Sequence, residues 1–159
     1  MTDIPFRVGL GYDVHRLAAD ETLILGGVEI PSDVGTVAHS DGDVLLHAVC
    51  DAVLGAAALG DIGEHFPDTD PQYLGVSSLN LLRRCMELIT ARGWIVGNVD
   101  VTLVLERPKI LPFKQQIRAN IAGAVGIPVD RVALKATTGE RLGFIGSGDG
   151  VEAQAVVLM

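Results

Sequence analysis

The chain has 159 residues and a net charge of -8, and 48% of its residues are hydrophobic while only 4% are aromatic. This length predicts a single domain over residues 1–159, with a core built from Val, Leu, Ile and Ala. The acidic balance excludes general nucleic-acid binding, because no basic stripe is present to neutralise phosphates. No apolar run approaches the ~20 residues of a membrane span.

The N-terminus and the cysteines suggest where the protein works. A signal peptide would show a basic segment followed by an apolar run, and the first residues of the chain do not show this pattern. The two cysteines, Cys50 and Cys85, fall inside apolar helical patterns. We interpret them as small buried side chains of a protein in a reducing compartment. A cytoplasmic location is the resulting prediction.

Hydrophobic periodicity predicts alternating strands and helices along the chain. In chain order these are a strand over 5–14, a hairpin over 22–31, a helix over 41–59, a polar loop over 60–76, a helix over 77–92, a strand through 99–105, a helix over 111–125, and strands over 132–138 and 150–159. Because a hairpin is antiparallel, the pattern favours an α+β fold with helices packed on one face of a mixed sheet.

Local signals support several of these boundaries. Gly26-Gly27 separates two apolar segments, as in a tight hairpin. Ser40 and Asp43 form an S-x-x-D capping pattern that would open the first helix. That helix would end at Gly60.

Polar side chains at the start of the first helix predict a metal site. Asp43, His47 and Asp51 point the same way from a helix otherwise lined with Leu and Ala. Asp13 and His15 lie on one face at the end of the first strand. A shared divalent ion would offset the cost of burying such groups, and two imidazoles with one carboxylate are typical of catalytic zinc. The spacing is equally compatible with Asp13 capping a turn and His47 bonding to Asp43.

Three further segments are candidates for binding phosphate, sugar or base. In KATTGERLGF, 135–144, hydroxyls and turn amides suit phosphate oxygens, and Glu140 suits a hard cation such as Mg²⁺. The same segment is compatible with an ST-turn and an exposed Glu-Arg pair. The acidic loop over 61–70 could bind a polyol or be merely solvated. Lys109 in ERPKIL, 106–111, could contact a base and a phosphate.

Together, several of these segments resemble one family, 2-C-methyl-D-erythritol 2,4-cyclodiphosphate synthase of the non-mevalonate isoprenoid pathway. The resemblance covers almost the whole chain in order. It rests on GYDVHR at 11–16, AHSDGDVLLHA at 38–48, GDIGEHFPDTDP at 60–71, NVDVT at 98–102 and KATTGERLGF at 135–144.

The resemblance implies a phosphorus-oxygen lyase. The substrate would be 4-diphosphocytidyl-2-C-methyl-D-erythritol 2-phosphate, whose 2-phosphate attacks the β-phosphorus, closes a cyclic diphosphate and expels CMP. A phosphate oxygen is already an anionic nucleophile, so no general base is predicted. The rival interpretations are a metal-dependent phosphohydrolase and a non-enzymatic assembly or ligand-binding protein.

The resemblance also implies roles for individual residues. A zinc-like ion would bind Asp13, His15 and His47, and Mg²⁺ or Mn²⁺ would lie near Glu140. His39 and Thr138 would stabilise the transition state. The substrate-binding residues so implied are Asp13, Val14, His15, His39, Ser40, Asp61, Ile62, Gly63, Phe66, Pro67, Asp68, Thr69 and Asp70 on the methylerythritol phosphate side, and Leu105, Glu106, Arg107, Pro108, Lys109, Ile110, Leu111, Thr137, Thr138, Gly139 and Glu140 on the cytidine diphosphate side.

Members of the family are homotrimers whose active sites are shared between neighbours, and the resemblance implies the same assembly here. Some members bind an isoprenoid diphosphate in an apolar cavity on the threefold axis. Here Phe144 keeps the apolar part of that cavity, but Ser147 stands where those members have an arginine. The absence of that guanidinium puts binding of an isoprenoid diphosphate in this cavity in doubt.

Overall fold

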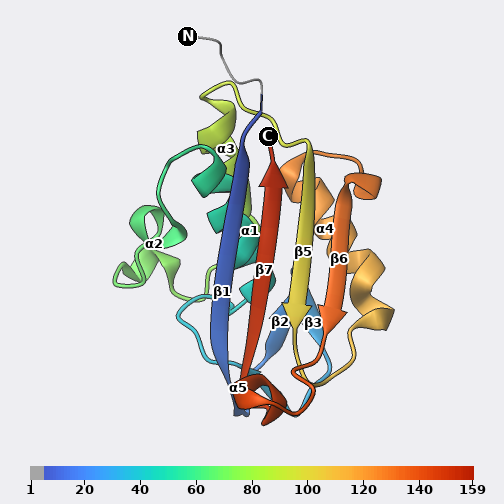
Figure 1. Cartoon of the computed structure of the whole chain (residues 1–159). Helices are drawn as coiled ribbons and strands as arrows, with labels where there is room; N and C mark the ends of the chain where they lie inside the picture. The colour runs from blue at the N-terminus through green and yellow to red at the C-terminus, as the bar shows by residue number, and fades with distance from the viewer. Residues whose placement is uncertain (1–5) are drawn as a thin grey trace.

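The computed structural model describes residues 6–159, so Pro5 of the first predicted strand lies outside the described residues. A five-stranded mixed sheet has the order β4-β1-β7-β5-β6 (Figure 1). β7 pairs antiparallel with both β1 and β5, and β5 pairs parallel with β6. The strands are β1 Val8–Ala19, β4 Val34–Thr36, β5 Asn98–Val104, β6 Val132–Thr137 and β7 Gly150–Leu158.

The longer helices cover one face of this sheet, which confirms the predicted α+β class (Figure 1). A separate hairpin of β2 and β3 confirms the Gly26-Gly27 turn. The remaining elements are β2 Leu23–Leu25, β3 Val28–Ile30, α1 Val44–Ala56, α2 Ile62–His65, α3 Ser78–Thr90, α4 Lys114–Val125, α5 Gly143–Gly146, and the 3-10 turns η1 Pro71–Tyr73, η2 Leu111–Phe113 and η3 Val129–Arg131. Among the described residues, no helix is long and apolar enough to cross a bilayer.

α1 is the central helix of the core, and ten of its 13 residues are buried. The exceptions are His47, Asp51 and Gly55, which stand four residues apart and therefore form a single line along the helix. Cys50 is fully buried in α1 and Cys85 in α3, and both are free thiols, as predicted.

β1 packs against α1 with almost no space between the two backbones. A Cβ added at Gly9 would lie 1.8 Å from the carbonyl oxygen of Ala52, and one at Gly11 would lie 1.8 Å from that of Ala48. Only glycine permits this approach. Asp13 continues the same helix-facing side of β1, so the close packing brings its carboxylate beside α1.

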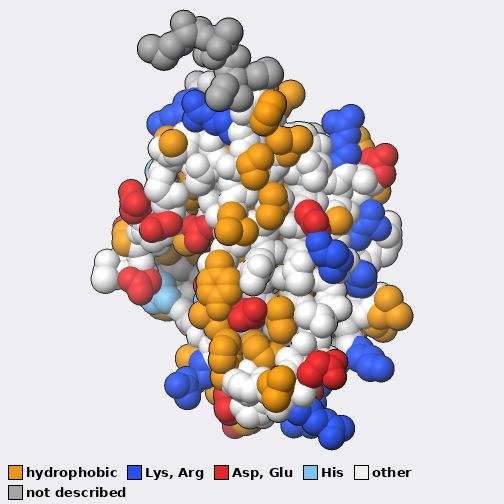
Figure 2. Space-filling model, viewed as in Figure 1, with side chains coloured by type: hydrophobic (Ala, Val, Ile, Leu, Met, Phe, Trp, Pro, Cys, Tyr) orange, Lys and Arg blue, Asp and Glu red, His pale blue; other side chains and the backbone are white. Residues whose placement is uncertain are grey.

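The opposite face of the sheet carries none of the longer helices, and apolar side chains are exposed there, with the short helix α5 at its lower end (Figure 1). We call this surface the open sheet face and define it by Val8, Leu10, Tyr12, Val14, Val156 and Leu158, which are 39–67% exposed. In Figure 2 these hydrophobic side chains form a continuous band over β1 and β7. A contiguous patch of this kind usually marks an interaction surface.

Three predicted boundaries were wrong, and one of them is the end of the first helix, which lies at Ala56 rather than next to Gly60. β1 continues five residues beyond Val14 because it pairs with β7 as far as Arg16 and then with β4, so Asp13 and His15 lie within the strand. The first helix begins at Val44 rather than at residue 41, and Asp43 is its N-cap. The predicted S-x-x-D capping box is therefore absent, and the Ser40 hydroxyl instead accepts from the N–H of Gly42.

Candidate active site

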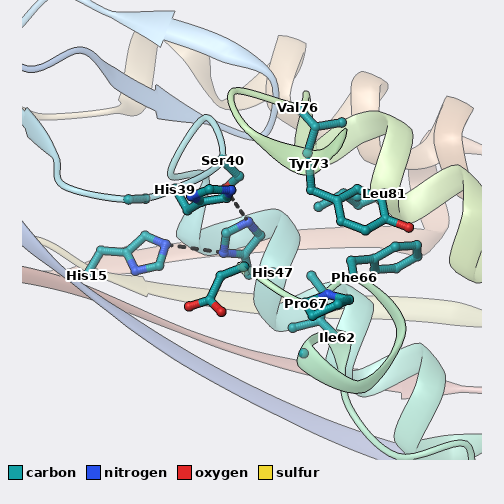
Figure 3. Close-up of a pocket in the computed structure, with 13 residues that line it drawn as sticks. His15, His39, Ser40, His47, Ile62, Phe66, Pro67, Tyr73, Val76 and Leu81 are labelled. Atoms are coloured by element: carbon teal, nitrogen blue, oxygen red, sulfur yellow. Dashed lines mark hydrogen bonds between the residues drawn. The ribbon is translucent and has the colours of Figure 1, made fainter. Parts of the chain in front are cut away.

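Three side chains from two elements converge at the edge of the core. Asp13 Oδ2 lies 3.0 Å from His47 Nδ1 and 3.4 Å from His15 Nε2, and the two imidazole nitrogens are 3.2 Å apart. All three atoms fall within 4.8 Å of one another, as the ligands of one metal ion would. Figure 3 shows the two rings turned toward each other from β1 and α1. The structure therefore brings together the three residues predicted to bind zinc.

The backbone of β1 determines which nitrogen of His15 faces the cluster. His15 Nδ1 donates to the carbonyl oxygen of Val14 at 2.9 Å, because a carbonyl can only accept. Nε2 of the neutral ring is then left with a lone pair directed at Asp13 and His47. Such a second hydrogen bond fixes the tautomer of most metal-binding histidines.

The charges in the cluster also suit a divalent cation. Burial lowers the pKa of His15 more than the neighbouring Asp13 carboxylate raises it, so this ring stays neutral. Burial lowers the pKa of His47 as well, but its hydrogen bond to Asp13 and the carboxylate charge outweigh burial and raise it overall. The Asp13 carboxylate therefore favours a positive charge at His47 Nδ1, whether this is carried by a proton or by a cation. Two neutral imidazoles and one carboxylate match the ligand set of catalytic zinc.

The prediction that one ion serves the whole polar line of α1 was wrong for its two aspartates. Asp43 accepts backbone N–H groups of Gly26 at 2.9 Å, Gly27 at 2.7 Å and Leu46 at 3.1 Å. Its full burial raises its pKa to about 6, although these hydrogen bonds act in the opposite direction. Asp51 accepts the N–H of Ile62 at 2.7 Å. Backbone amides, rather than a metal, satisfy both carboxylates.

A cavity of about 380 Å³ opens beside the cluster (Figure 3). Asp61 and Asp70 lie outside its lining, because they cap α2 and η1 through the N–H groups of Glu64 and Gln72. Thr69 and Val14 also lie outside it. The predicted residues that line the cavity are His15, His39, Ser40, His47, Ile62, Gly63, Phe66, Pro67 and Asp68, and those not predicted are Ala38, Tyr73, Val76 and Leu81.

A second cavity, of about 290 Å³, lies beside β5, β6 and the segments that follow them. Its lining contains the predicted residues Leu105, Glu106, Pro108, Lys109, Ile110, Leu111, Thr137 and Thr138, together with Leu103, Lys114 and Ala136. Arg107, Gly139 and Glu140 lie outside the lining. Gly139 nevertheless donates its N–H to Glu106 at 3.0 Å, and Thr138 donates its hydroxyl to Glu140 at 3.2 Å.

The two cavities share no lining residue. The first opens beside β1 and α1, the second beside β5 and β6, and β7 separates β1 from β5 in the sheet. Within one chain the structure therefore does not bring the predicted cytidine side to the metal cluster, and Glu140 is not part of that cluster.

Two polar residues behind His47 were also not predicted. Ser78, at the start of α3, places its hydroxyl 2.9 Å from His47 Nε2, and Asp41 accepts from both the hydroxyl and the N–H of Ser78. The one local signal that the sequence offers is a pair of serines at the start of an apolar helix, and serines there suggest helix capping rather than a neighbouring histidine.

Comparison with known proteins shows where this architecture recurs. The sequence model of the YgbB family matches residues 6–159. The 2-C-methyl-D-erythritol 2,4-cyclodiphosphate synthase of Geobacter sulfurreducens is 58% identical over 153 residues, covering 96% of this chain and 98% of that protein. The synthase of Trichlorobacter lovleyi is 56% identical with the same coverage.

Solved structures agree in fold. A 2C-methyl-D-erythritol-2,4-cyclodiphosphate synthase bound to CDP is 43% identical, with a TM-score of 0.89 over 96% of this chain and 100% of that chain. The bifunctional IspDF of Campylobacter jejuni is 40% identical, with a TM-score of 0.93 over 98% of this chain. The present chain spans 42% of that longer protein.

Proposed function

The chain belongs to the YgbB family, and from this premise we propose that it converts 4-diphosphocytidyl-2-C-methyl-D-erythritol 2-phosphate to 2-C-methyl-D-erythritol 2,4-cyclodiphosphate with release of CMP. The proposal places a synthase domain over residues 1–159 in the non-mevalonate isoprenoid pathway and in the cytoplasm. The observation that carries it is the convergence of Asp13, His15 and His47 beside a cavity.

Two places in the chain offer ligand groups suited to divalent cations. Zinc or a similar ion held by Asp13, His15 and His47 would supply Lewis acidity toward the attacked phosphate, and Mg²⁺ or Mn²⁺ near Glu140 would neutralise the diphosphate. The donor set supports the first assignment, because two imidazole nitrogens and one carboxylate oxygen lie within 4.8 Å of one another. Glu140 accepts from the Thr138 hydroxyl and lies next to the second cavity.

The residues of the chain would act mainly by binding and orientation, since phosphoryl transfer needs in-line geometry and little covalent help. His39 and Ser40 line the first cavity and would hold the methylerythritol phosphate near the cluster. Lys109 and Thr138 line the second and would hold the cytidine diphosphate, with Thr138 and His39 stabilising the transition state. The apolar wall with Ile62 and Phe66 would exclude water, which favours cyclisation over hydrolysis.

Separation of the two cavities supports a homotrimer with shared active sites. One complete site requires the metal cavity of one subunit and the cytidine cavity of the next, because β7 keeps them apart within a chain. The open sheet face offers the apolar surface for such an obligate contact.

We further propose that the trimer does not bind an isoprenoid diphosphate on its axis. Ser147 donates its hydroxyl to Asp149 at 2.5 Å, so a carboxylate occupies the turn in which an anion would need a cation. Phe144 and Tyr12 line a groove beside Asp149, which keeps the site apolar in part.

Product analysis with the His47→Ala variant tests the proposal. Wild-type protein with zinc and Mg²⁺ should release CMP and the cyclic diphosphate in equal amounts. His47→Ala should lower CMP release by at least about 10³-fold, the scale expected when a group that stabilises the transition state is lost. The variant should keep its thermal unfolding midpoint within a few degrees and still bind CDP, because Lys109 and Thr138 belong to the other cavity. A linear phosphate product would instead identify a phosphohydrolase, and unchanged turnover would reject a catalytic metal site.

A further inference from the structure

Nε2 of His47, the ring nitrogen that does not face Asp13, lies beside Ser78, which in turn contacts Asp41. Neither Ser78 nor Asp41 lines either cavity. His47 Nε2 lies 2.9 Å from the hydroxyl of Ser78, whose side chain is fully buried. That hydroxyl is also hydrogen-bonded to Asp41 Oδ1. The three groups therefore form a continuous chain from a carboxylate, through a hydroxyl, to an imidazole of the metal cluster.

Donor and acceptor chemistry assigns every proton in this chain. An ionised carboxylate only accepts, so the single O–H of Ser78 donates to Asp41. The oxygen of Ser78 is then free only to accept, and the Ser40 hydroxyl 3.2 Å away can also accept, so both contacts of His47 Nε2 are hydrogen bonds when this nitrogen carries the proton. In a neutral ring the lone pair must consequently be on Nδ1, the nitrogen that faces Asp13 and His15.

Asp41 is held firmly in the orientation that this chain requires. Its Oδ2 accepts the backbone N–H of Ser78 at 2.9 Å and its Oδ1 accepts that of Asp43 at 3.3 Å. The N–H of Asp41 donates to the carbonyl oxygen of Val76. A carboxylate with these contacts cannot rotate to release the hydroxyl without losing several hydrogen bonds at once.

We propose that Asp41 and Ser78 are positioning residues that hold His47 as the Nε2–H tautomer and direct its Nδ1 lone pair at the bound cation. This inference rests on the proposed metal site of the synthase and adds the residues that orient one of its ligands. Loss of a group that hydrogen-bonds to a metal ligand on the side away from the metal typically changes metal affinity 10–100-fold.

We call the hydrogen-bonded chain from Asp41 through Ser78 to His47 the relay. Two variants in the relay and one neighbouring control distinguish an effect on the orientation of His47 from an effect on folding. Ser78→Ala should weaken zinc binding about tenfold, since Nε2 can still donate to Ser40 at 3.2 Å. Asp41→Asn should weaken it about 100-fold. In that variant the amide would donate to Ser78, whose hydroxyl would then donate to His47 and move the ring proton to Nδ1. Ser77→Ala is the control, because Ser77 precedes α3 and makes no capping side-chain hydrogen bond.

Zinc dissociation constants from chelator competition provide the first measurement, with the thermal unfolding midpoint of each metal-free variant recorded beside them. The expected order of affinity is Ser77→Ala equal to wild type, then Ser78→Ala, then Asp41→Asn. Equal affinity in all four proteins would overturn the proposal. A loss in Ser77→Ala as large as in Ser78→Ala would also overturn it, because the effect would then belong to the start of α3 rather than to the relay.

A spectroscopic measurement tests the relay directly. In the zinc-loaded wild type, the Nε2–H proton of His47 should be visible by NMR with ¹⁵N-labelled histidine and should exchange slowly with water. Ser78→Ala should accelerate that exchange at least about tenfold, since a net hydrogen bond of about 1.4 kcal/mol corresponds to a factor of ten. Equally fast exchange in the two proteins would overturn the assignment of Ser78 as acceptor.

These outcomes are independent of the proposed reaction. If the expected order of zinc affinity is observed but wild type releases no CMP from the proposed substrate, the relay stands and the synthase proposal fails. If wild type releases CMP but the four proteins bind zinc equally, the synthase stands and the relay fails.

Discussion

Identical side chains around α1 have different roles because different donors meet them. Asp43 meets three backbone N–H groups and becomes a fully buried cap. Asp51 meets one N–H, from Ile62. Asp13 instead meets two imidazole nitrogens, and after its bond to the N–H of Val14 one oxygen still faces the cluster. Only the carboxylate that retains an oxygen without a backbone donor is suited to a metal.

The raised pKa of His47 predicts how zinc affinity depends on pH. Zinc needs the Nδ1 lone pair, and this nitrogen is protonated below the pKa of His47, which its bond to Asp13 raises above the ordinary 6.5. Affinity should therefore be constant above that pKa and fall about tenfold for each pH unit below it. The pKa of His15 is lowered, so this ring should add a second proton to the dependence only at more acidic pH.

Zinc dissociation constants measured by calorimetry between about pH 5 and 9, across the ordinary range of histidine titration, check this expectation. If zinc affinity begins to fall only below pH 6.5, then burial, rather than the Asp13 carboxylate, dominates the pKa of His47. An affinity that does not vary with pH would contradict histidine ligation altogether.

At the scale of single residues, the sequence predicts the three residues that the structure brings together as candidate metal ligands, but not the roles of the remaining aspartates. Asp13, His15 and His47 stand at spacings that place them on the faces of β1 and α1 that meet. Besides the local cap from Leu46, the donors that satisfy Asp43 are the N–H groups of the hairpin turn 16 and 17 residues earlier, and no local pattern reveals those two. Ser78 escaped prediction for a similar reason, since it lies 31 residues from His47.

At the scale of elements, the close contact between β1 and α1 builds the metal cluster. Gly9 and Gly11 have no Cβ, so the strand lies directly on the helix and carries Asp13 and His15 to the level of His47. A side chain at either glycine would meet backbone atoms, which cannot rotate away. Any change in the packing of β1 against α1 would therefore also change the distances between Asp13, His15 and His47.

Gly11→Ala should consequently damage both stability and metal binding. The added methyl group would lie 1.8 Å from the carbonyl oxygen of Ala48, so the strand must move away from α1. We expect a loss of about 3 kcal/mol in the free energy of unfolding, at the upper end for overpacking, with weaker zinc binding. Denaturant unfolding and chelator competition measure the two effects.

Gly123→Ala provides the matched control for this prediction. Gly123 is an exposed residue within α4 with nothing within 4 Å of an added Cβ. Alanine there should stabilise the protein by about 0.5–1 kcal/mol through its helix propensity. If Gly11→Ala were as stable as this control and bound zinc normally, the close approach of β1 to α1 would not determine the site.

Periodicity predicts the longer elements well and the short ones poorly. Alternation at Val99, Val101 and Leu103 indicated β5, whose burial alternates as expected. α2 has only four residues, too few for a helical pattern, and depends on the Asp61 cap and on the bond from Ile62 to Asp51. The bond to Asp51 joins α2 to α1 and cannot be recognised from the local sequence.

At the scale of the whole molecule, one chain has two separate cavities and an uncovered apolar sheet face. The metal cavity and the cytidine cavity lie on opposite sides of β7, and the open sheet face runs over β1 and β7 (Figure 2). Composition could indicate an apolar excess but not its position on the surface. Association of subunits through such a face would cover it and complete the sites in a single step.

Shared sites predict that two inactive variants restore activity when they are mixed. His47→Ala damages the metal half-site and Lys109→Ala the cytidine half-site, which lie in different cavities. After unfolding and refolding together in equal amounts, random trimers would contain some sites built from two intact halves. In a cyclic trimer these are about a quarter of all sites, so about a quarter of wild-type CMP release is expected.

A second mixture shows whether the recovered activity arises from sharing. His47→Ala with Asp13→Ala places both lesions in the same half-site, since the two side chains lie 3.0 Å apart in one chain. Every site in that mixture has a damaged metal half, so no recovery is expected. Recovery in both mixtures would point to independent repair within each chain, and recovery in neither would mean that each subunit carries out the reaction alone. Only recovery limited to the first pair fits sites that form between neighbouring subunits.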